Sequence, residues 1–444
     1  MEALIAYRDR AERFIRRKVA WNRLFHAVSY GRSALWVVPL LAIVAVLVFA
    51  PVLRWIDGWL GWRMAGLGLS GATALYETVI TLSLSFLVFT FGSLLVAIQV
   101  ASGQLTPRII ATTLLCDNVV RTSVGLFVFT LIFSVMALNR LETRVLEITA
   151  FVTAVLGIAC MAMFLFLIDY AARLLRPVSI LTRVGNEGMR VIAALYPTLS
   201  TDTPSITLSL PDADRIVRHE GTPGIVLAID RDALIREARR ANGLIECVPH
   251  VGDFVAVDEP ILRLHRGAAN IPDQTLRAAV ALGAERTMEQ DPLFAFRIIT
   301  DIALKALSPA INDPTTAVLA IDQLQRLLRG VGRRQLSREV LDDAAGEHRL
   351  IYRTPMWLDF VQISSAEIRM AGAGSVQVAR RLRAMLDNLI ATLPPHRHEA
   401  LLRERERLDD MVQHAYQHPD DLALARVADS QGLGASQPPA TPHP

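Results

Sequence analysis

Lysine is almost missing from this chain of 444 residues, in which only Lys18 and Lys305 occur. Arginine therefore supplies nearly all of the 46 basic residues, which exceed the 43 acidic residues by three. So small an excess of positive charge does not indicate a nucleic-acid-binding protein. Lysine is also absent from the segment GDFVAVDEPIL at 252–262, so a biotinyl or lipoyl carrier would lack its attachment residue there.

Cysteine is scarce as well, and the cysteines that occur are far apart. They form no CxxC pair and are Cys116, Cys160 and Cys247. This spacing argues against a disulfide framework and against a zinc site. Two histidine pairs, His396 with His398 and His414 with His418, have no cysteine or carboxylate partner at a recognised metal-ligand spacing. We therefore predict no metal and no other cofactor.

The sequence also lacks the common signatures of catalytic sites. It contains no phosphate-binding loop, no GxGxxG after a strand, no HExxH and no GxSxG. Ser308 has no evident base beside it, and no pair stands out among the carboxylates between 285 and 301. An enzyme is therefore not the favoured interpretation.

Long apolar runs, in contrast, are abundant. Hydrophobic residues make up 52% of the chain, the mean hydropathy is +0.35, and the apolar residues concentrate between 34 and 168. We expect four transmembrane helices in this region, because a helix needs about 20 apolar residues to cross a bilayer. Their predicted bounds are Ala34–Val52, Thr78–Ser102, Thr122–Leu138 and Leu146–Ile168.

The second of these helices carries polar residues along one side. Small, hydroxylated and amide side chains repeat at heptad spacing, and they are Thr78, Thr81, Ser85, Gly92, Gln99 and Ser102. In lipid such side chains are tolerated best against another helix or against water. The pattern therefore predicts a central helix whose polar side either packs against its neighbours or lines a pathway.

The distribution of charge sets the expected orientation. Residues 1–33 contain eight basic and three acidic residues, and four more arginines follow the last apolar run. By the positive-inside rule both termini are cytoplasmic, in a multi-pass protein of the bacterial inner membrane. Residues 1–33 indicate a basic amphipathic segment on the membrane surface or simply a basic tail. The loop Arg54–Glu77, which contains three tryptophans, is then expected outside.

Behind the membrane region, 34–175, the periodicity changes twice. Short apolar runs with Gly, Pro and Asp turns over 176–270 predict a small β-barrel or sandwich. Helical periodicity dominates 271–418, and the composition of 419–444 indicates a disordered tail. The predicted fold is thus a membrane α-helical N-terminal region followed by a cytoplasmic α+β region with a helical subdomain.

Polar residues gather at the start of the helical region. Asp291-Pro292 and Asp313-Pro314 are each typical of a helix start, with Asp as the N-cap and Pro in the first turn. Candidate members of a polar cluster are Glu285, Arg286, Asp291, Arg297, Asp301, Asn312 and Asp313. They indicate helix capping and surface ion pairs, or else a ligand-binding or proton-sensing site.

One long segment resembles a known family. Residues 282–324, LGAERTMEQDPLFAFRIITDIALKALSPAINDPTTAVLAIDQL, resemble the signature of bacterial predicted membrane proteins with domain of unknown function 2254. LVAIQVASGQLTPR at 95–108 and GDFVAVDEPIL at 252–262 agree with that family in order and spacing. The resemblance implies N-terminal membrane helices and a cytoplasmic C-terminal region, and it assigns no role to any residue.

Three functions remain open on this basis. The first is an oligomeric channel or transport protein, whose second membrane helix lines the pathway and whose cytoplasmic part gates or senses. The second is a membrane-anchored sensor or scaffold without transport, and the third is a membrane-bound enzyme with a cytoplasmic site. The expected partners are the lipid bilayer, further copies of the chain and a small ion or small-molecule ligand, but no nucleic acid.

Overall fold

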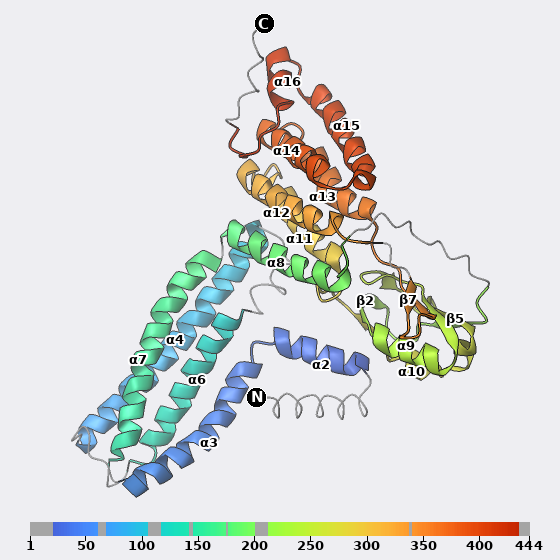
Figure 1. Ribbon diagram of the computed structural model, residues 1–444. Coiled ribbons are helices and arrows are strands. Elements are labelled where there is room, and N and C mark those ends of the chain that lie inside the picture. The colour runs from blue at the N-terminus through green and yellow to red at the C-terminus, as the bar shows by residue number, and fades with distance from the viewer. Residues whose placement is uncertain are drawn as a thin grey trace. The chain divides into compact units, whose positions relative to one another are not determined.

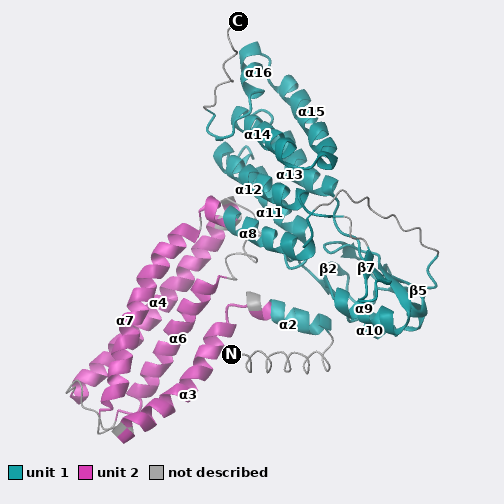
Figure 2. Cartoon of the chain, viewed as in Figure 1, with its two compact units in different colours: residues 1–29, 181–444 teal, residues 30–180 magenta. Residues whose placement is uncertain are grey.

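A computed structural model describes residues 21–60, 68–104, 117–141, 145–174, 176–199, 212–336 and 340–434 of the chain. The chain divides into two compact units, one of residues 30–180 and one of residues 1–29 with 181–444 (Figure 2). The first helix described, α2 (Trp21–Ser33), runs across this division. Residues 1–20 of the expected amphipathic segment lie outside the described residues.

Four long helices form the unit of residues 30–180 (Figure 1). They are α3 (Val37–Leu60), α4 (Leu69–Gln104), α6 (Asn118–Leu138) and α7 (Glu147–Leu174). Each is long and apolar enough to cross a membrane, which confirms the prediction of four such helices. The predicted loop Arg54–Glu77 is wrong in its extent, because α3 continues past Trp55 and Trp59 and α4 begins at Leu69.

Helix α6 is the central helix of this unit. It packs against α3, α4 and α7, and half of an 18-residue apolar stretch of α6 is buried, against 28% of the corresponding stretch of α4. Phe127 and Phe133 of α6 are fully buried between the other helices. The prediction that the second membrane helix is central is therefore wrong for a single chain. The hydroxyl groups of Ser123 and Ser134 on α6 bond to their own backbone, so α6 can be buried without unpaired donors there.

Buried carboxylates join the ends of these helices. Near the end of α3, Asp57 accepts hydrogen bonds at 3.1 Å from both the backbone N–H and the hydroxyl of Thr149, in the first turn of α7. At the other end, Asp117 caps α6 and accepts a 2.6 Å hydrogen bond from the hydroxyl of Tyr170 on α7. These contacts fix the face that each helix presents. Residues 105–116 lie outside the described residues, and with them Thr106-Pro107, a pair typical of a helix start.

The other unit begins with a mixed α/β region. Its strands are β1 (Arg215–Arg218), β2 (Gly224–Ile229), β3 (Gly243–Cys247), β4 (Phe254–Val255), β5 (Pro260–Arg266), β6 (Val280–Gly283), β7 (Val340–Asp342) and β8 (His348–Ile351). One sheet has the order β1-β5-β3-β8-β7, and the other has the order β4-β2-β6. The described strands close no barrel, so the predicted barrel or sandwich is not confirmed.

The two sheets share one hydrophobic core. It contains Val226 and Val280 of the smaller sheet with Ile245 and Leu264 of the larger one. Helix α9 (Arg231–Arg240) packs on this core, and the side chain of Asp230 caps its start by accepting from the backbone N–H of Ala233. The short helices η2 (Gly267–Asn270) and α10 (Asp273–Arg277) connect β5 to β6.

Helices make up the remainder of this unit. They are α8 (Pro177–Leu195), α11 (Pro292–Ala306), α12 (Pro314–Gly332), α13 (Trp357–Gly372), α14 (Val376–Thr392), η3 (Pro395–Arg397), α15 (His398–Ala415) and α16 (Pro419–Ala425). The starts of α11 and α12 confirm the prediction from the two Asp-Pro pairs. A capping carboxylate satisfies a free N–H, and proline needs no hydrogen bond in the first turn.

Residues 419–434 do not fit the predicted disordered tail. They contain α16 and a turn in which Asp429, which is fully buried, accepts hydrogen bonds from the backbone of Gly432 and Gly434. The guanidinium group of Arg380 on α14 donates to the carbonyl of Val427 at 3.0 Å. These buried polar contacts order a segment whose composition alone resembles a linker. Residues 435–444 lie outside the described residues.

Candidate functional site

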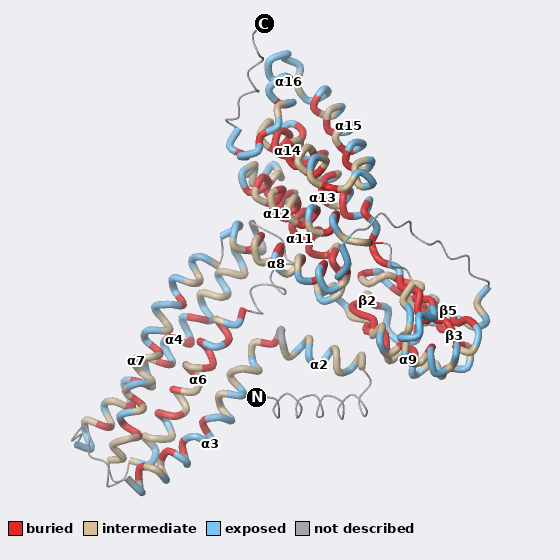
Figure 3. The backbone as a smooth tube through the Cα atoms, in the orientation of Figure 1, coloured by how far each residue is buried: buried red, intermediate tan, exposed pale blue. Residues whose placement is uncertain are grey.

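The predicted polar side of the second membrane helix faces away from the other helices of its own chain. Within α4 the exposed members are Thr78, Thr81, Ser85, Gly92 and Gln99, which we call the outer seam. Figure 3 shows exposed stretches along α4 in pale blue. A Cβ atom added to Gly92 would meet nothing within 4 Å. Val88 and Leu95 are exposed beside these residues, so the seam is partly apolar. The side chain of Ser102 lies outside the described residues.

The hydroxyl groups of the outer seam donate to their own helix. Thr78 donates to the carbonyl of Ala74 at 2.7 Å, and Thr81 and Ser85 donate at 2.8 Å to the carbonyls four residues earlier. These bonds satisfy each donor, so the hydroxyls do not by themselves require water. The side chain of Gln99 forms no hydrogen bond with any described residue of the chain. Its carboxamide, with two donors and one acceptor, is the costliest group of the seam to leave in lipid.

A second polar side of α4 points into the helix bundle and escaped the sequence analysis. Ser83 and Thr90 are fully buried there, one heptad apart. Near them, the thiol of Cys160 on α7 lies 3.2 Å from the hydroxyl oxygen of Thr130 on α6 and is placed to donate to it. The heptad spacing of Ser83 and Thr90 could have revealed this second polar side. The outer seam has more polar members, however, and therefore gave the stronger pattern in the sequence.

The predicted cytoplasmic cluster does not form one site. Arg286 and Asp291 lie together beside the turn between β3 and β4, around Gly252. Arg297 and Asp301 lie on α11, where they form an ion-pair network with Glu367 of α13. Asp291 caps the start of α11 and Asp301 lies ten residues further along the same helix, so roughly 15 Å of helix separates the two carboxylates.

The remaining predicted members have separate surroundings. The side chain of Glu285 is exposed and has no hydrogen-bond or ion-pair partner among the described residues. Asn312 adopts a left-handed conformation with φ of 48°, which Asn tolerates better than most residues. Asp313 caps α12 by accepting from the backbone N–H of Thr316 at 3.1 Å and from its hydroxyl at 2.5 Å.

The pair Arg286–Asp291 and the network of Arg297 differ in the pKa values of their members. Burial raises the pKa of Asp291 to about 6, although Arg286 and the N–H of Phe294 oppose this shift. In the other group, the hydrogen bond with Glu367 raises the pKa of Arg297, and the same bond lowers the pKa of Glu367. The Arg297 network is thus locked in its charged form, whereas Asp291 can change its protonation state near neutral pH.

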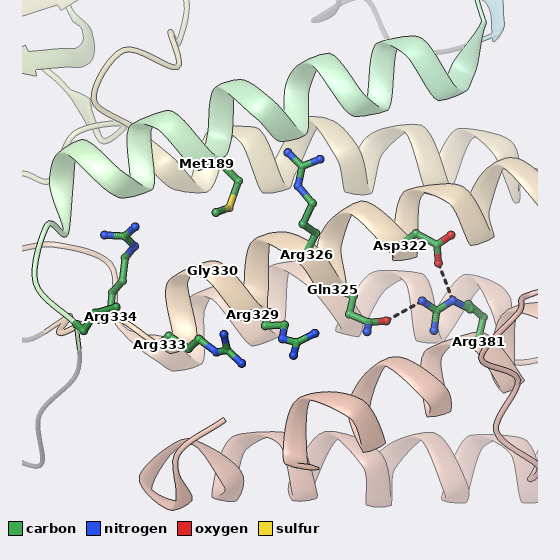
Figure 4. A pocket seen from close by; sticks show the side chains of 10 residues that line it. Met189, Asp322, Gln325, Arg326, Arg329, Gly330, Arg333, Arg334 and Arg381 are labelled. Atoms are coloured by element: carbon green, nitrogen blue, oxygen red, sulfur yellow. Dashed lines mark hydrogen bonds and ion pairs between the residues drawn. The ribbon is translucent and has the colours of Figure 1, made fainter. Parts of the chain in front are cut away.

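A pocket beside α12 brings together basic residues that the sequence analysis attributed to composition. Figure 4 shows its lining, which includes Arg326, Arg329, Arg333, Arg334 and Arg381 with Met189 of α8. The signal in the sequence is the spacing of three arginines at i, i+3 and i+7 along α12 and just past its end. In a chain that uses arginine almost exclusively, this spacing did not stand out.

Metal binding finds no support in the part of the chain that the structure describes. No group of three or more His, Cys, Asp or Glu side chains lies close enough there to hold a metal ion. The two described free cysteines, Cys160 and Cys247, are both buried. Burial raises the pKa of Cys247 to about 12, so this thiol is unreactive at neutral pH.

Comparison with known proteins confirms the resemblance seen in the sequence. The family of predicted membrane proteins with domain of unknown function 2254 matches residues 32–388. Similar curated proteins are uncharacterized proteins of Mycobacterium bovis and of two strains of Mycobacterium tuberculosis, each 24% identical over 439 residues. The matches cover 95% of this chain and 84% of each relative. No solved structure was found to match the chain significantly. The chain therefore belongs to the bacterial family of predicted membrane proteins with domain of unknown function 2254.

Proposed function

We propose that copies of this protein associate in the bacterial inner membrane around a pathway for a small ion or solute, which the outer seam of α4 lines. Both termini are cytoplasmic in this proposal, and the parts at 176–270 and 271–418 gate the pathway or sense a signal. The observation that carries the proposal is the exposure of the seam: the polar residues of α4 face away from the chain's own bundle.

Contact between lipid and the polar side chains of the outer seam is unfavourable, which supports association of copies of the chain through this side of α4. Gln99 has no partner among the described residues, and an amide in the hydrocarbon core is unfavourable without one. Ser85 and Gly92 offer little side-chain bulk, so the α4 helices of neighbouring copies can leave room for water between them. The apolar side chains exposed on α3, such as Leu41 and Val48, are suited to lipid instead.

The two alternatives differ in what they require of the seam. In a membrane-anchored sensor or scaffold, the seam only packs against another helix and excludes water. A membrane-bound enzyme requires a cytoplasmic pocket with reactive groups. Asp291, the described carboxylate whose pKa is raised, instead caps α11 through its hydrogen bond with Phe294. The sensor is therefore the stronger alternative.

Cysteine accessibility tests the proposal. The native Cys116, Cys160 and Cys247 are replaced by alanine, and single cysteines are placed at Ser85, Gly92 and Gln99. A membrane-impermeant thiol reagent should modify all three positions in membranes, because a thiol ionises and reacts only where water reaches it. Bulky adducts at Ser85 or Gly92 should also reduce any conductance of the reconstituted protein.

Two sets of control cysteines show how a position that faces lipid and a position that faces the protein interior react with the same reagent. Leu41 and Val48 of α3 are as exposed in a single chain as the seam, whereas Leu87 of α4 faces the bundle. All three should stay unmodified in membranes. If the seam cysteines are as unreactive as those at Leu41 and Val48 in a folded protein, the pathway is rejected and the sensor or scaffold is favoured.

A further inference from the structure

We infer that the arginine pocket beside α12 is a binding site for a ligand that carries a phosphate group. The pocket has a volume of about 480 Å³, within the range of small-molecule sites. Five of its ten lining residues are arginines, and its one acidic residue is Asp322; the arginines are Arg326, Arg329, Arg333, Arg334 and Arg381.

Only one of these arginines has a carboxylate partner among the described residues. Arg381 donates to Asp322 and to Gln325, each at 2.6 Å. Asp322 thereby compensates one guanidinium charge, and four positive charges remain around the pocket.

The other four arginines meet neutral groups or solvent. Arg326 donates to the amide oxygen of Asn186 at 2.5 Å, and Arg334 donates to the backbone carbonyl of Tyr196 at 2.5 Å. Arg329 and Arg333 are exposed, and the side chain of neither forms a hydrogen bond or ion pair with a described residue. Figure 4 shows Arg326 extending toward α8, whereas Arg329 and Arg333 extend away from it. Exposed side chains without partners can rotate onto a ligand at little cost.

This imbalance contrasts with the rest of the same unit. Two buried arginines elsewhere in it face carboxylates, in the pairs Arg369–Glu404 at 2.7 Å and Arg349–Asp343 at 2.9 Å. The whole chain likewise has nearly equal numbers of basic and acidic residues. Composition alone therefore does not account for five arginines and one aspartate in one pocket.

The walls of the pocket come from three helices and are fixed by close packing. A Cβ atom on Gly330 of α12 would lie 2.6 Å from the sulfur of Met189, and one on Gly188 would lie 3.3 Å from Leu327. The two glycines thus let α8 approach α12, while Arg381 comes from α14. Such a site is formed before the ligand arrives, which lowers the cost of binding.

Guanidinium groups suit phosphate in geometry and charge. Each can donate two parallel hydrogen bonds to phosphate oxygens. Several guanidinium groups together balance the two negative charges of a phosphate group, whereas a carboxylate carries only one. The phosphate could belong to a lipid headgroup or to a soluble phosphorylated molecule. In the sequence, only two residues separate the end of the last membrane helix at Leu174 from the start of α8 at Pro177, and α8 supplies Met189 to the pocket.

Binding of two soluble probes to the full-length protein in uncharged nanodiscs tests the inference. The probes are dihexanoyl phosphatidic acid, which presents a lipid headgroup, and adenosine triphosphate, measured calorimetrically at about 0.15 M salt to screen weak surface attraction. At least one should bind saturably. The double variant Arg329→Gln/Arg333→Gln should lower its affinity by about tenfold or more, because charge-assisted hydrogen bonds are lost.

A matched variant controls for net charge. Arg236→Gln/Arg239→Gln removes two exposed arginines of α9 that also have no side-chain partner among the described residues. It should bind both probes as the wild type does. Stronger binding of phosphatidic acid assigns the site to a headgroup, and stronger binding of the nucleotide assigns it to a soluble ligand. Saturable binding of neither probe, or equal losses in the two double variants, overturns the inference.

Discussion

The Nε atom of Arg286 lies 3.8 Å from Oδ2 of Asp291, too far for a hydrogen bond. Arg286 instead donates to the carbonyl of Gly252 at 3.0 Å. Oδ2 of Asp291 is buried and has no hydrogen-bond partner among the described residues, while Oδ1 accepts from the N–H of Phe294 at 3.2 Å. Gly252, at φ of 97°, leaves no room for a Cβ atom, which would lie 2.6 Å from Oδ2. Only one of the two oxygen atoms of this buried carboxylate accepts a hydrogen bond, so its ionised form is costly.

Stability should therefore fall as Asp291 ionises. Its pKa is raised by burial from 3.8 to about 6, so between these values the folded state binds more protons than the unfolded state. Stability decreases with rising pH across that window, by roughly 3 kcal/mol in total, and the loss persists above it. Asp291→Asn keeps a capping oxygen without the charge, so it should lack this decrease.

Hydrogen exchange of α11 in the full-length protein in detergent measures this effect. The difference in protection between wild type and Asp291→Asn should grow from about pH 4 to about pH 6 and then stay constant. Subtracting the two proteins removes the contribution of other titrating groups. A difference that does not depend on pH would mean that Asp291 stays ionised throughout, with Arg286 as its effective partner.

Asp313 should matter for its oxygen atoms and not for its charge. It accepts two hydrogen bonds from Thr316 at the start of α12, so Asp313→Ala should lower stability by about 0.5–2 kcal/mol. Asp313→Ser should recover most of the loss, because serine is also a good N-cap. Thermal unfolding of the two variants in detergent gives the comparison. If serine behaves like alanine while both proteins remain folded, the carboxylate has a role beyond capping.

The starts of α11 and α12 were predictable because the residues that begin a helix lie next to each other in the sequence. An Asp-Pro pair needs no distant partner to begin a helix, and long apolar runs define membrane helices by length alone. The two Asp-Pro pairs accordingly lie where α11 and α12 begin, at Pro292 and Pro314. The outer seam was also found as a pattern, since heptad spacing depends only on the geometry of a helix.

Pairing across long distances was not predictable in the same way. β8 pairs in parallel with β3, about a hundred residues earlier, through only two described residue pairs. The polar stretch around β7 and β8 carries no local sign of that partner. The arginine pocket escaped for a similar reason, because Arg381 joins the α12 arginines only in the folded helices. Which side of α4 faces inward likewise depends on α6 and α7.

Reporter fusions should establish the orientation of the chain. A fluorescent protein that folds only in the cytoplasm should be active at either terminus, because arginines concentrate in 1–33 and after α7. Alkaline phosphatase, which is active only in the periplasm, should be active when inserted between α3 and α4. Phosphatase activity at a terminus and in that loop together would exclude a four-helix topology with both termini in the cytoplasm.

Two glycines of the membrane unit should respond differently to substitution by leucine: one variant should lose stability and the other should not. A Cβ atom on Gly157 of α7 would lie 2.9 Å from a methyl group of Val79 on α4, whereas one on Gly92 would meet nothing within 4 Å. Gly157→Leu should push α4 from α7 and lower stability by about 1–3 kcal/mol. Gly92→Leu should leave the thermal unfolding of the detergent-solubilised protein unchanged. Equal losses in both variants would mean that another helix already covers Gly92.

Oligomer mass then decides what covers the outer seam. If the seam lines a pathway, leucine at Gly92 narrows the lumen without separating the copies, so light scattering should give the wild-type mass while conductance falls. If copies pack directly against each other through Gly92, the larger side chain forces their helices apart and the mass should drop toward that of one chain, because close helix contacts in membranes depend on small residues. A drop in mass, with unfolding unaffected, would make the seam an interface between copies and would remove the pathway from the proposal.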